Sequence, residues 1–139
     1  MSADKSRMHN NNLVLVVDDD PGMLRAVVRL LRQHDYEVLS FSSARAFRNH
    51  SDIEKARCVI LDINLPDESG IQLREGLKAA RISVPVIYIT GNAKPAVREA
   101  ALKSGCIAFL TKPFSAQELI GPLKRASAGL SLRYPTLER

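Results

Sequence analysis

The residues of this chain best suited to chemistry are carboxylates placed directly after short apolar runs. Asp18 and Asp19 follow the run Leu13–Val17, and Asp62 stands near the end of the run Cys58–Ile63. Carboxylates that gather in one place repel one another and take up protons unless a positive charge lies among them. Because oxygen ligands favour a hard cation, the pattern predicts a site for Mg²⁺, which accepts one or two protein carboxylates and keeps waters and a phosphate oxygen.

Two further polar residues, Thr90 and Lys112, follow two other apolar runs and add to this site. Lys112 supplies a movable positive charge, and Thr90 supplies a hydroxyl donor. Together with a carboxylate and a hard metal they form a receptor for a phosphoryl group, with one Asp available as the nucleophile. Each residue alone is weak evidence, because Asp and Thr are also common in turns and helix caps. The set of four, each after its own apolar run, favours the phosphoryl site.

Five apolar runs must position these residues. Their starts are separated by 24, 21, 27 and 21 residues, which leaves room for a helix and two turns between neighbouring runs. Such spacing is typical of a parallel α/β sheet. If the strand order is 2-1-3-4-5, the first and third strands lie about 4.8 Å apart, so that Asp18, Asp19 and Asp62 converge. The predicted strands are Leu13–Val17, Glu37–Phe41, Cys58–Ile63, Pro85–Ile89 and Cys106–Leu110, the second being an edge strand because polar residues interrupt it.

The segments between the runs have helical periodicity. The first helix is predicted to begin at Asp20-Pro21, and the fourth to begin at Pro95 and end before Gly105. The fifth is predicted to begin at Ser115, with Glu118 completing a capping box, and Pro122 is expected to kink it or end it early. The second and third helices are predicted over residues 44–50 and 69–80, the third burying Leu73, Leu77 and Ala80.

Composition limits the classes of protein that fit. The hydrophobic fraction of 45% and the charged fraction of 25% are those of one soluble globular domain. The net charge of +5 lies mostly near the two ends, since residues 13–120 hold 14 Lys and Arg against 13 Asp and Glu, so no basic stripe for nucleic acid is visible. No apolar run is long enough to cross a membrane, and a cytoplasmic protein is expected. Cys58 and Cys106 are each expected to begin a strand as buried, reduced thiols.

Four motifs together resemble the response-regulator receiver domain of two-component signalling. The resemblance covers about residues 13–128 and implies a flavodoxin-like, doubly wound, five-stranded parallel sheet in the order 2-1-3-4-5 with five helices. Residues 1–12 would then be a flexible N-terminal segment, and residues 129–139 a linker or tail. The motifs are Leu-Val-Leu-Val-Val-Asp-Asp-Asp (13–20), Val-Ile-Leu-Asp-Ile-Asn-Leu-Pro-Asp-Glu-Ser-Gly (59–70), Val-Ile-Tyr-Ile-Thr-Gly (86–91) and Gly-Cys-Ile-Ala-Phe-Leu-Thr-Lys-Pro-Phe (105–114).

The resemblance also implies a role for each site residue. Asp62 would be the phosphoacceptor, and Asp18 and Asp19 would be acids of the Mg²⁺ site, to which Asn64 lends its main-chain carbonyl. Thr90 and Lys112 would bind the phosphoryl oxygens. Phe109 takes the place of the aromatic switch residue, without the hydroxyl of a Tyr, and a cis peptide is expected at Lys112-Pro113. The acids Asp67 and Glu68, where the family often has neutral residues, are expected to make the site more negative.

The implied partner is a sensor histidine kinase that donates the phosphoryl group. The chain would then be a regulator that catalyses only its own phosphorylation and slow dephosphorylation. Its switched surface would comprise the fourth helix, the fifth strand and the fifth helix, where a homodimer could form on phosphorylation, although Pro122 counts against that face. Residues 130–139 resemble the segment that precedes a LuxR-type helix-turn-helix domain. Transcription is therefore the expected output, with DNA contacted only through an output domain absent from this chain.

Two other readings compete with a phosphoaccepting receiver. Haloacid-dehalogenase-like phosphatases also place an Asp nucleophile after their first strand, and Asp18, Asp20, Thr90 and Lys112 fit that pattern superficially. However, Gly22 stands where those enzymes need a Thr, and no later acidic pair supplies their metal site. The other alternative is a receiver fold that serves only as a binding module. The motif residues are chemically intact, so the sequence does not favour a loss of phosphorylation.

Overall fold

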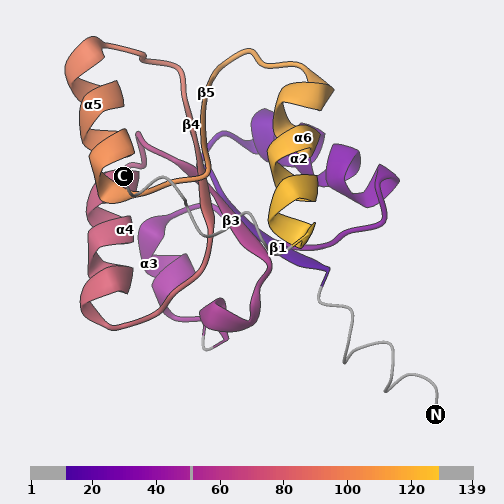
Figure 1. Ribbon diagram of the computed structural model, residues 1–139, viewed down its shortest axis with the longest axis horizontal. Coiled ribbons are helices and arrows are strands. Elements are labelled where there is room, and N and C mark those ends of the chain that lie inside the picture. Colours follow the sequence, from indigo (N-terminus) through magenta and orange to yellow (C-terminus); the bar gives the residue numbers. More distant parts are fainter. Residues whose placement is uncertain (1–11, 51, 129–139) are drawn as a thin grey trace.

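A computed structural model describes residues 12–50 and 52–128, which form a five-stranded parallel sheet between two layers of helices (Figure 1). The strand order is β2-β1-β3-β4-β5, and every neighbouring pair is parallel. The predicted α/β fold, strand order and five helices are therefore confirmed. The strands are β1 (Leu13–Val17), β2 (Glu37–Phe41), β3 (Cys58–Asp62), β4 (Val86–Thr90) and β5 (Ala108–Thr111).

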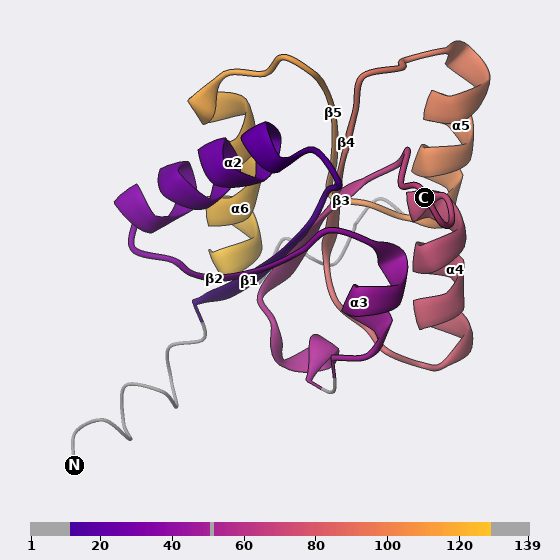
Figure 2. The same ribbon diagram turned by 180° about the vertical axis from the view of Figure 1, so that it is seen from behind.

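The helices divide between the two faces of the sheet, as the opposite views in Figures 1 and 2 show. One face carries α2 (Pro21–Gln33) and α6 (Ala116–Ala128). The other carries α3 (Ala44–Arg48), α4 (Gly70–Ala79) and α5 (Pro95–Ser104), and the 3-10 turn η1 (Ile53–Lys55) precedes β3. Because both faces are covered, the central strands are wholly buried, which explains their unbroken apolar sequences.

Edge position explains why β2 differs from the central strands. Among residues 12–50 and 52–128 it pairs only with β1, and three of its five residues, Glu37, Leu39 and Ser40, are exposed. The polar residues that interrupt this run are therefore tolerated, because no strand of this part of the chain covers the other side. The prediction of an edge strand is confirmed.

Side-chain caps fix where the helices begin. The carboxylate of Asp20 accepts a hydrogen bond from the Gly22 N–H at the start of α2. Ser69 and Gln72 form a reciprocal capping box at the start of α4. Ser115 and Glu118 bond to each other's main-chain N–H before α6, as the sequence predicts.

Several predicted boundaries and burials are wrong. β3 ends at Asp62 rather than at Ile63, and β4 runs from Val86 to Thr90 rather than from Pro85 to Ile89. β5 begins at Ala108, so Cys106 precedes the strand and is only half-buried, whereas Cys58 does begin β3 and is buried. Ala80 is exposed, because it follows the end of α4 at Ala79.

The second helix ends at Arg48 rather than at residue 50. Pro122 lies inside α6 without ending it, since the helix continues to Ala128 and the Pro122 ring is buried. Burial of the ring against the sheet offsets the lost main-chain hydrogen bond. The predicted N-terminal segment, apart from Asn12, and the predicted tail lie outside the described residues. Among residues 12–50 and 52–128, no helix is long and apolar enough to span a bilayer.

Candidate phosphoryl-accepting site

The register of the sheet brings the ends of four strands to one edge. Val17 of β1 pairs with Leu61 of β3, so that Asp18 and Asp62 follow as neighbours. Asp62 pairs with Ile89 of β4, which puts Thr90 one residue further along. Thr90 in turn pairs with Thr111 of β5, and Lys112 follows. Parallel strands end at the same edge, so a chain segment of nearly a hundred residues contributes to one site.

Three carboxylates gather at this edge. One oxygen from each of Asp18, Asp19 and Asp62 lies within 4.8 Å of the others, with Asp18 and Asp62 buried and Asp19 exposed. The ammonium group of Lys112 lies between two of them, 3.0 Å from Asp18 Oδ2 and 3.2 Å from Asp62 Oδ2. The structure therefore brings together the acids and the lysine that the sequence singled out.

Main-chain N–H groups hold the two buried carboxylates in place. Asp18 Oδ1 accepts from the N–H of Asp20 at 2.9 Å, and Asp62 Oδ1 accepts from the N–H of Asn64 at 3.0 Å. Each carboxylate thus keeps its Oδ2 for the interior of the site. Asp18 Oδ2 is buried and, among the described residues, accepts no hydrogen bond, although the Lys112 ammonium lies near enough to form an ion pair with it. A buried anionic oxygen without a hydrogen-bond donor is suited to coordinate a cation.

Burial and charge shift the pKa values of this cluster. Burial is the largest cause that raises the pKa of Asp62 to about 6, and the negative charge of Asp18 adds to it. The Asn64 N–H and Lys112 lower that pKa and limit the rise. Burial works against the charged form of Lys112, but Asp18 and Asp62 outweigh it, so that the pKa of Lys112 lies above its ordinary value. Lys112 is therefore a cation at neutral pH.

Thr90 is buried, and local partners engage its hydroxyl. Thr90 Oγ1 donates to the main-chain oxygen of Asn92 at 3.2 Å and accepts from the Asn92 N–H at 3.0 Å. It also accepts from the side-chain amide of Asn64 at 3.2 Å. The motif resemblance implies a role only for the main-chain carbonyl of Asn64 and none for Asn92. Thr90 itself was the available signal, since Ser and Thr hydroxyls often bond to main-chain groups two residues further on.

Phe109 lies beside this site on β5 and is half-buried. The guanidinium group of Arg98, on α5, lies over its ring at 5.2 Å from the centroid. Such a contact is attractive, because the face of an aromatic ring carries negative charge density. The half-buried ring of Phe109 thus has a cationic neighbour on α5 that no sequence pattern predicts.

Asp67 and Glu68 do not belong to the acidic cluster, contrary to the expectation that they make it more negative. The Asp67 carboxylate accepts from the N–H groups of Ala44 at 3.1 Å and Arg45 at 3.0 Å, at the start of α3. These two bonds lower the pKa of Asp67 below its ordinary value. Glu68 pairs with Arg48 of the same helix. Both acids therefore tie the loop after Asp62 to α3.

A close main-chain contact fixes the other end of this loop. The N–H of Gly70 donates to the carbonyl of Ile63 at 2.8 Å, and a Cβ atom at Gly70 would lie 2.4 Å from the main-chain oxygen of Asp62. Only glycine fits where α4 begins against the strand that carries Asp62. The peptide bond between Lys112 and Pro113 is cis, as the motif resemblance implied.

Comparison with known proteins establishes the family. The family model for the response regulator receiver domain matches residues 14–124, and the chain belongs to this family. Response regulator protein TodT of Pseudomonas putida is 34% identical over 115 residues, which cover 83% of this chain and 51% of TodT. Transcriptional regulatory protein FixJ of Rhizobium meliloti is 30% identical over 117 residues, 84% of this chain and 57% of FixJ. The chain thus spans about half the length of these curated relatives.

Solved structures agree with this assignment. A structure of the response regulator StyR superimposes with a TM-score of 0.78 at 33% identity, covering 88% of this chain and 62% of that one. The protein is accordingly a receiver domain of the two-component response regulators, a class of regulators rather than of classical enzymes. Receiver domains bind Mg²⁺ at an acidic pocket, and this chain has a cluster of three acids, Asp18, Asp19 and Asp62.

Proposed function

We propose that a sensor histidine kinase phosphorylates Asp62 and that Mg²⁺ assists the transfer. The observation that carries this proposal is the position of the Lys112 ammonium between the buried oxygens of Asp18 and Asp62, with Asp18 Oδ2 left without a hydrogen bond among the described residues. A buried anionic pocket with one fixed cation is suited to a second cation and a phosphoryl group.

The transfer balances with the residues at hand. Ionised Asp62 attacks phosphorus with its Oδ2, once Lys112 releases its hydrogen bond to that oxygen, and an O–P bond forms. The N–P bond of the donor phosphohistidine breaks as the imidazole leaves. Lys112 moves from the carboxylate towards a phosphoryl oxygen, a motion that its half-buried side chain permits. Thr90 can donate to another phosphoryl oxygen once its hydroxyl releases the Asn92 carbonyl. These donors stabilise the charge on the group being transferred.

The residues that would hold Mg²⁺ are Asp18, Asp19, Asp62 and the main-chain carbonyl of Asn64. Asp18 Oδ2, which accepts no hydrogen bond among the described residues, and the exposed carboxylate of Asp19 are suited to such a hard cation, which retains part of its water shell. When bound, the metal neutralises charge on the phosphoryl oxygens and aligns the donor with Asp62. Asn64 would then serve the site twice, through its carbonyl and through the amide that holds Thr90.

The proposed switch starts at Thr90 and reaches the surface through Phe109. When Thr90 turns towards the phosphoryl group it vacates space, and the half-buried Phe109 ring can move in, leaving the guanidinium of Arg98. The surface of α5, β5 and α6 changes as a result. Phe109 has no hydroxyl to bury, so the inward state costs no hydrogen bond there.

The proposed output is transcription, which the receiver domain, about residues 13–128, would control through a separate output domain. FixJ, one of the relatives, is a transcriptional regulatory protein, and residues 130–139 resemble the segment before a LuxR-type helix-turn-helix domain. DNA would be contacted through such an output domain. Dimerisation on phosphorylation would use the α5, β5 and α6 surface, where Pro122 lies within α6.

Acetyl phosphate and intact-protein mass spectrometry test this proposal. The wild-type protein should gain one phosphoryl group in Mg²⁺ and none in EDTA, and Asp62→Asn should gain none. Asp35→Asn is the matched control, because Asp35 is exposed, lies outside the cluster and has φ of 68°, a conformation that Asn also adopts. A Mg²⁺-dependent phosphoryl group on Asp62→Asn at the wild-type rate would refute the assignment.

A second measurement separates a switch from an inert binding module. Beryllofluoride, a mimic of the phosphoryl group, should shift the NMR signals of Asp62, Thr90, Phe109 and α5. Shifts confined to the acidic cluster would support the inert module instead. Steady turnover of a phosphate ester, lost in Asp18→Asn but kept in Asp62→Asn, would support the phosphatase alternative.

A further inference from the structure

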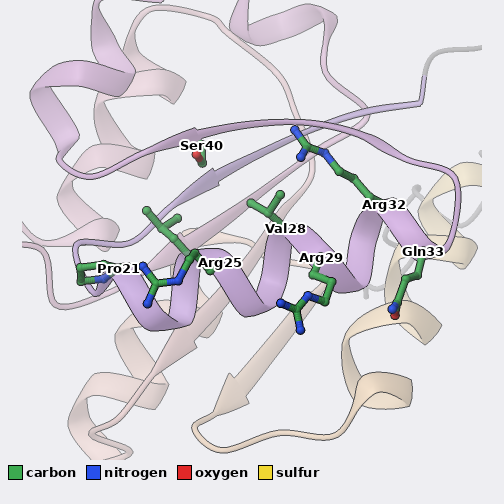
Figure 3. A pocket seen from close by; sticks show the side chains of 8 residues that line it. Pro21, Arg25, Val28, Arg29, Arg32, Gln33 and Ser40 are labelled. Atoms are coloured by element: carbon green, nitrogen blue, oxygen red, sulfur yellow. The ribbon is translucent and has the colours of Figure 1, made fainter.

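A groove runs between α2 and the edge strand β2, and none of its lining residues belongs to the acidic cluster (Figure 3). Figure 3 shows Ser40 on the strand, with Val28 and Arg32 reaching towards it from the helix. The residues that line the groove include Leu24, Arg25, Val28, Arg29, Arg32 and Ser40.

Three guanidinium groups border this groove. Arg25, Arg29 and Arg32 are exposed and lie four and three residues apart, which places them along one face of α2. Within the described parts of the chain, no carboxylate lies within 4.0 Å of any of the three. Three positive charges in a row are therefore available to an anionic partner.

The groove is not purely polar. Leu24 and Val28 are half-buried and expose apolar surface between the arginines. A partner that fits must place apolar side chains on these two residues and carboxylates beside the guanidinium groups. Arginine suits this arrangement, because its planar fork binds a carboxylate through two parallel hydrogen bonds.

Among the strands that the structure describes, none pairs with the outer edge of β2, the strand that borders the groove. The N–H of Glu37 and the carbonyl of Phe41 bond on the side of β1. Because main-chain groups alternate between the two sides of a strand in a parallel pair, the N–H and carbonyl groups of Val38 and Ser40 face the outer edge. Ser40 thus presents its side chain to the groove and its main chain to any added strand.

We propose that this groove binds an extended acidic segment of a partner protein, which adds to the edge of β2 and pairs its carboxylates with Arg25, Arg29 and Arg32. Main-chain hydrogen bonds to Val38 and Ser40 would fix its direction, and alternate side chains would meet α2. A nucleic acid or a lipid surface fits less well. Residues 13–128 hold 16 Lys and Arg against 13 Asp and Glu, so the domain has only a weak long-range positive field to attract a polyanion.

NMR titration of the wild-type protein with a defined peptide tests the proposal. The probe is a nonapeptide with blocked ends in which every second residue is, in turn, glutamate, valine, glutamate, valine and glutamate, with threonine between them, so that one face of the strand carries both residue types. The control peptide carries lysine in place of glutamate. The glutamate peptide should shift the signals of α2 and β2 and slow hydrogen exchange at Val38 and Ser40. Each single substitution Arg25→Gln, Arg29→Gln or Arg32→Gln should weaken binding about two- to fivefold, the range expected for an exposed ion pair.

The matched control is Arg81→Gln, which removes one exposed arginine outside the groove and should leave binding unchanged. Gln keeps the helix propensity of Arg, so the α2 variants should unfold at the wild-type temperature. The proposal is overturned if the glutamate peptide gives no saturable shift up to about 1 mM. Equal binding of the lysine peptide, or shifts elsewhere than α2 and β2, overturns it too. So does binding of a single-stranded RNA or of anionic vesicles, but not of the peptide, through the same arginines.

Discussion

Replacement of Gly70 by Ala tests how closely α4 packs on the strand that carries Asp62. A Cβ atom there would lie 2.4 Å from the main-chain oxygen of Asp62 and 3.0 Å from Ile63 Cα. Real Cβ contacts do not fall below 3.0 Å, so helix and strand must separate by at least about 0.6 Å. The neighbouring atoms belong to main chain, which cannot swing aside as a flexible side chain would.

Two measurements should respond to this separation. Overpacking of this kind costs about 3 kcal/mol, which corresponds to a fall in Tm of roughly 10 °C for a domain of this size. The separation of helix and strand also displaces Asp62, the residue proposed to be phosphorylated. Because a misplacement of about 1 Å can cost about a hundredfold in rate, Gly70→Ala should slow phosphorylation by acetyl phosphate about tenfold. Urea unfolding at low temperature gives the free energy, and mass spectrometry gives the rate.

Gly76→Ala is the matched control in the same helix. Its Cβ would meet only the end of the Arg48 side chain, at 3.7 Å. Since Ala is favoured over Gly inside helices, Gly76→Ala should raise the free energy of unfolding by about 0.5–1 kcal/mol and leave the phosphorylation rate unchanged. If Gly70→Ala were as stable and as fast as the wild type, the close approach of α4 to Asp62 would be wrong.

Three further predictions follow from burial and hydrogen bonding. Burial raises the pKa of the Cys58 thiol to about 12 and makes Cys58 inaccessible to reagents. A thiol reagent should therefore modify at most Cys106 in the native protein and both cysteines after unfolding. Rapid labelling of Cys58 in the native protein would contradict the fold. Tyr88→Phe should lower the free energy of unfolding by about 1 kcal/mol, because the buried hydroxyl loses its 2.6 Å bond to Ser104, which keeps its own bond to the Ala101 carbonyl; an unchanged urea midpoint would refute this. Folding raises the pKa of Asp62 from 3.8 to about 6. Without divalent ions, protonation of Asp62 therefore adds to the free energy of unfolding below pH 4, and this contribution is lost as the pH rises through 6. The Tm of Asp62→Asn should lack this part of the pH dependence.

The sheet was predictable because its strands are read from local patterns. β1 and β2 have the predicted bounds, and the edge position of β2 follows from its polar residues. The start of β5 was not predictable, because Cys106 and Ile107 are as apolar as the strand itself and only the pairing of Ala108 with Ile87 sets the boundary. The course of α6 past Pro122 was also missed, since burial of the ring depends on tertiary packing.

The site was predictable as a set of residues but not as a network. Strand ends in a parallel sheet must meet at one edge, so the convergence of Asp18, Asp62, Thr90 and Lys112 follows from the strand order. The bond from the Asn64 amide to Thr90 depends on side-chain rotamers, which no sequence pattern specifies. The cover of Arg98 over Phe109 depends likewise on the packing of α5 against β5.

The tie between Asp67 and α3 has a consequence for the order of folding. A helix of five residues is far below the length that is stable alone in water, and the N–H groups of Ala44 and Arg45 have their acceptor 23 and 22 residues away. α3 can therefore form only after β3 has paired and brought the loop that follows it into place. Mutations in α3 should accordingly speed unfolding and leave the folding rate almost unchanged. In the native protein, α3 and this loop should open as one cooperative unit, so that their amides exchange hydrogen together.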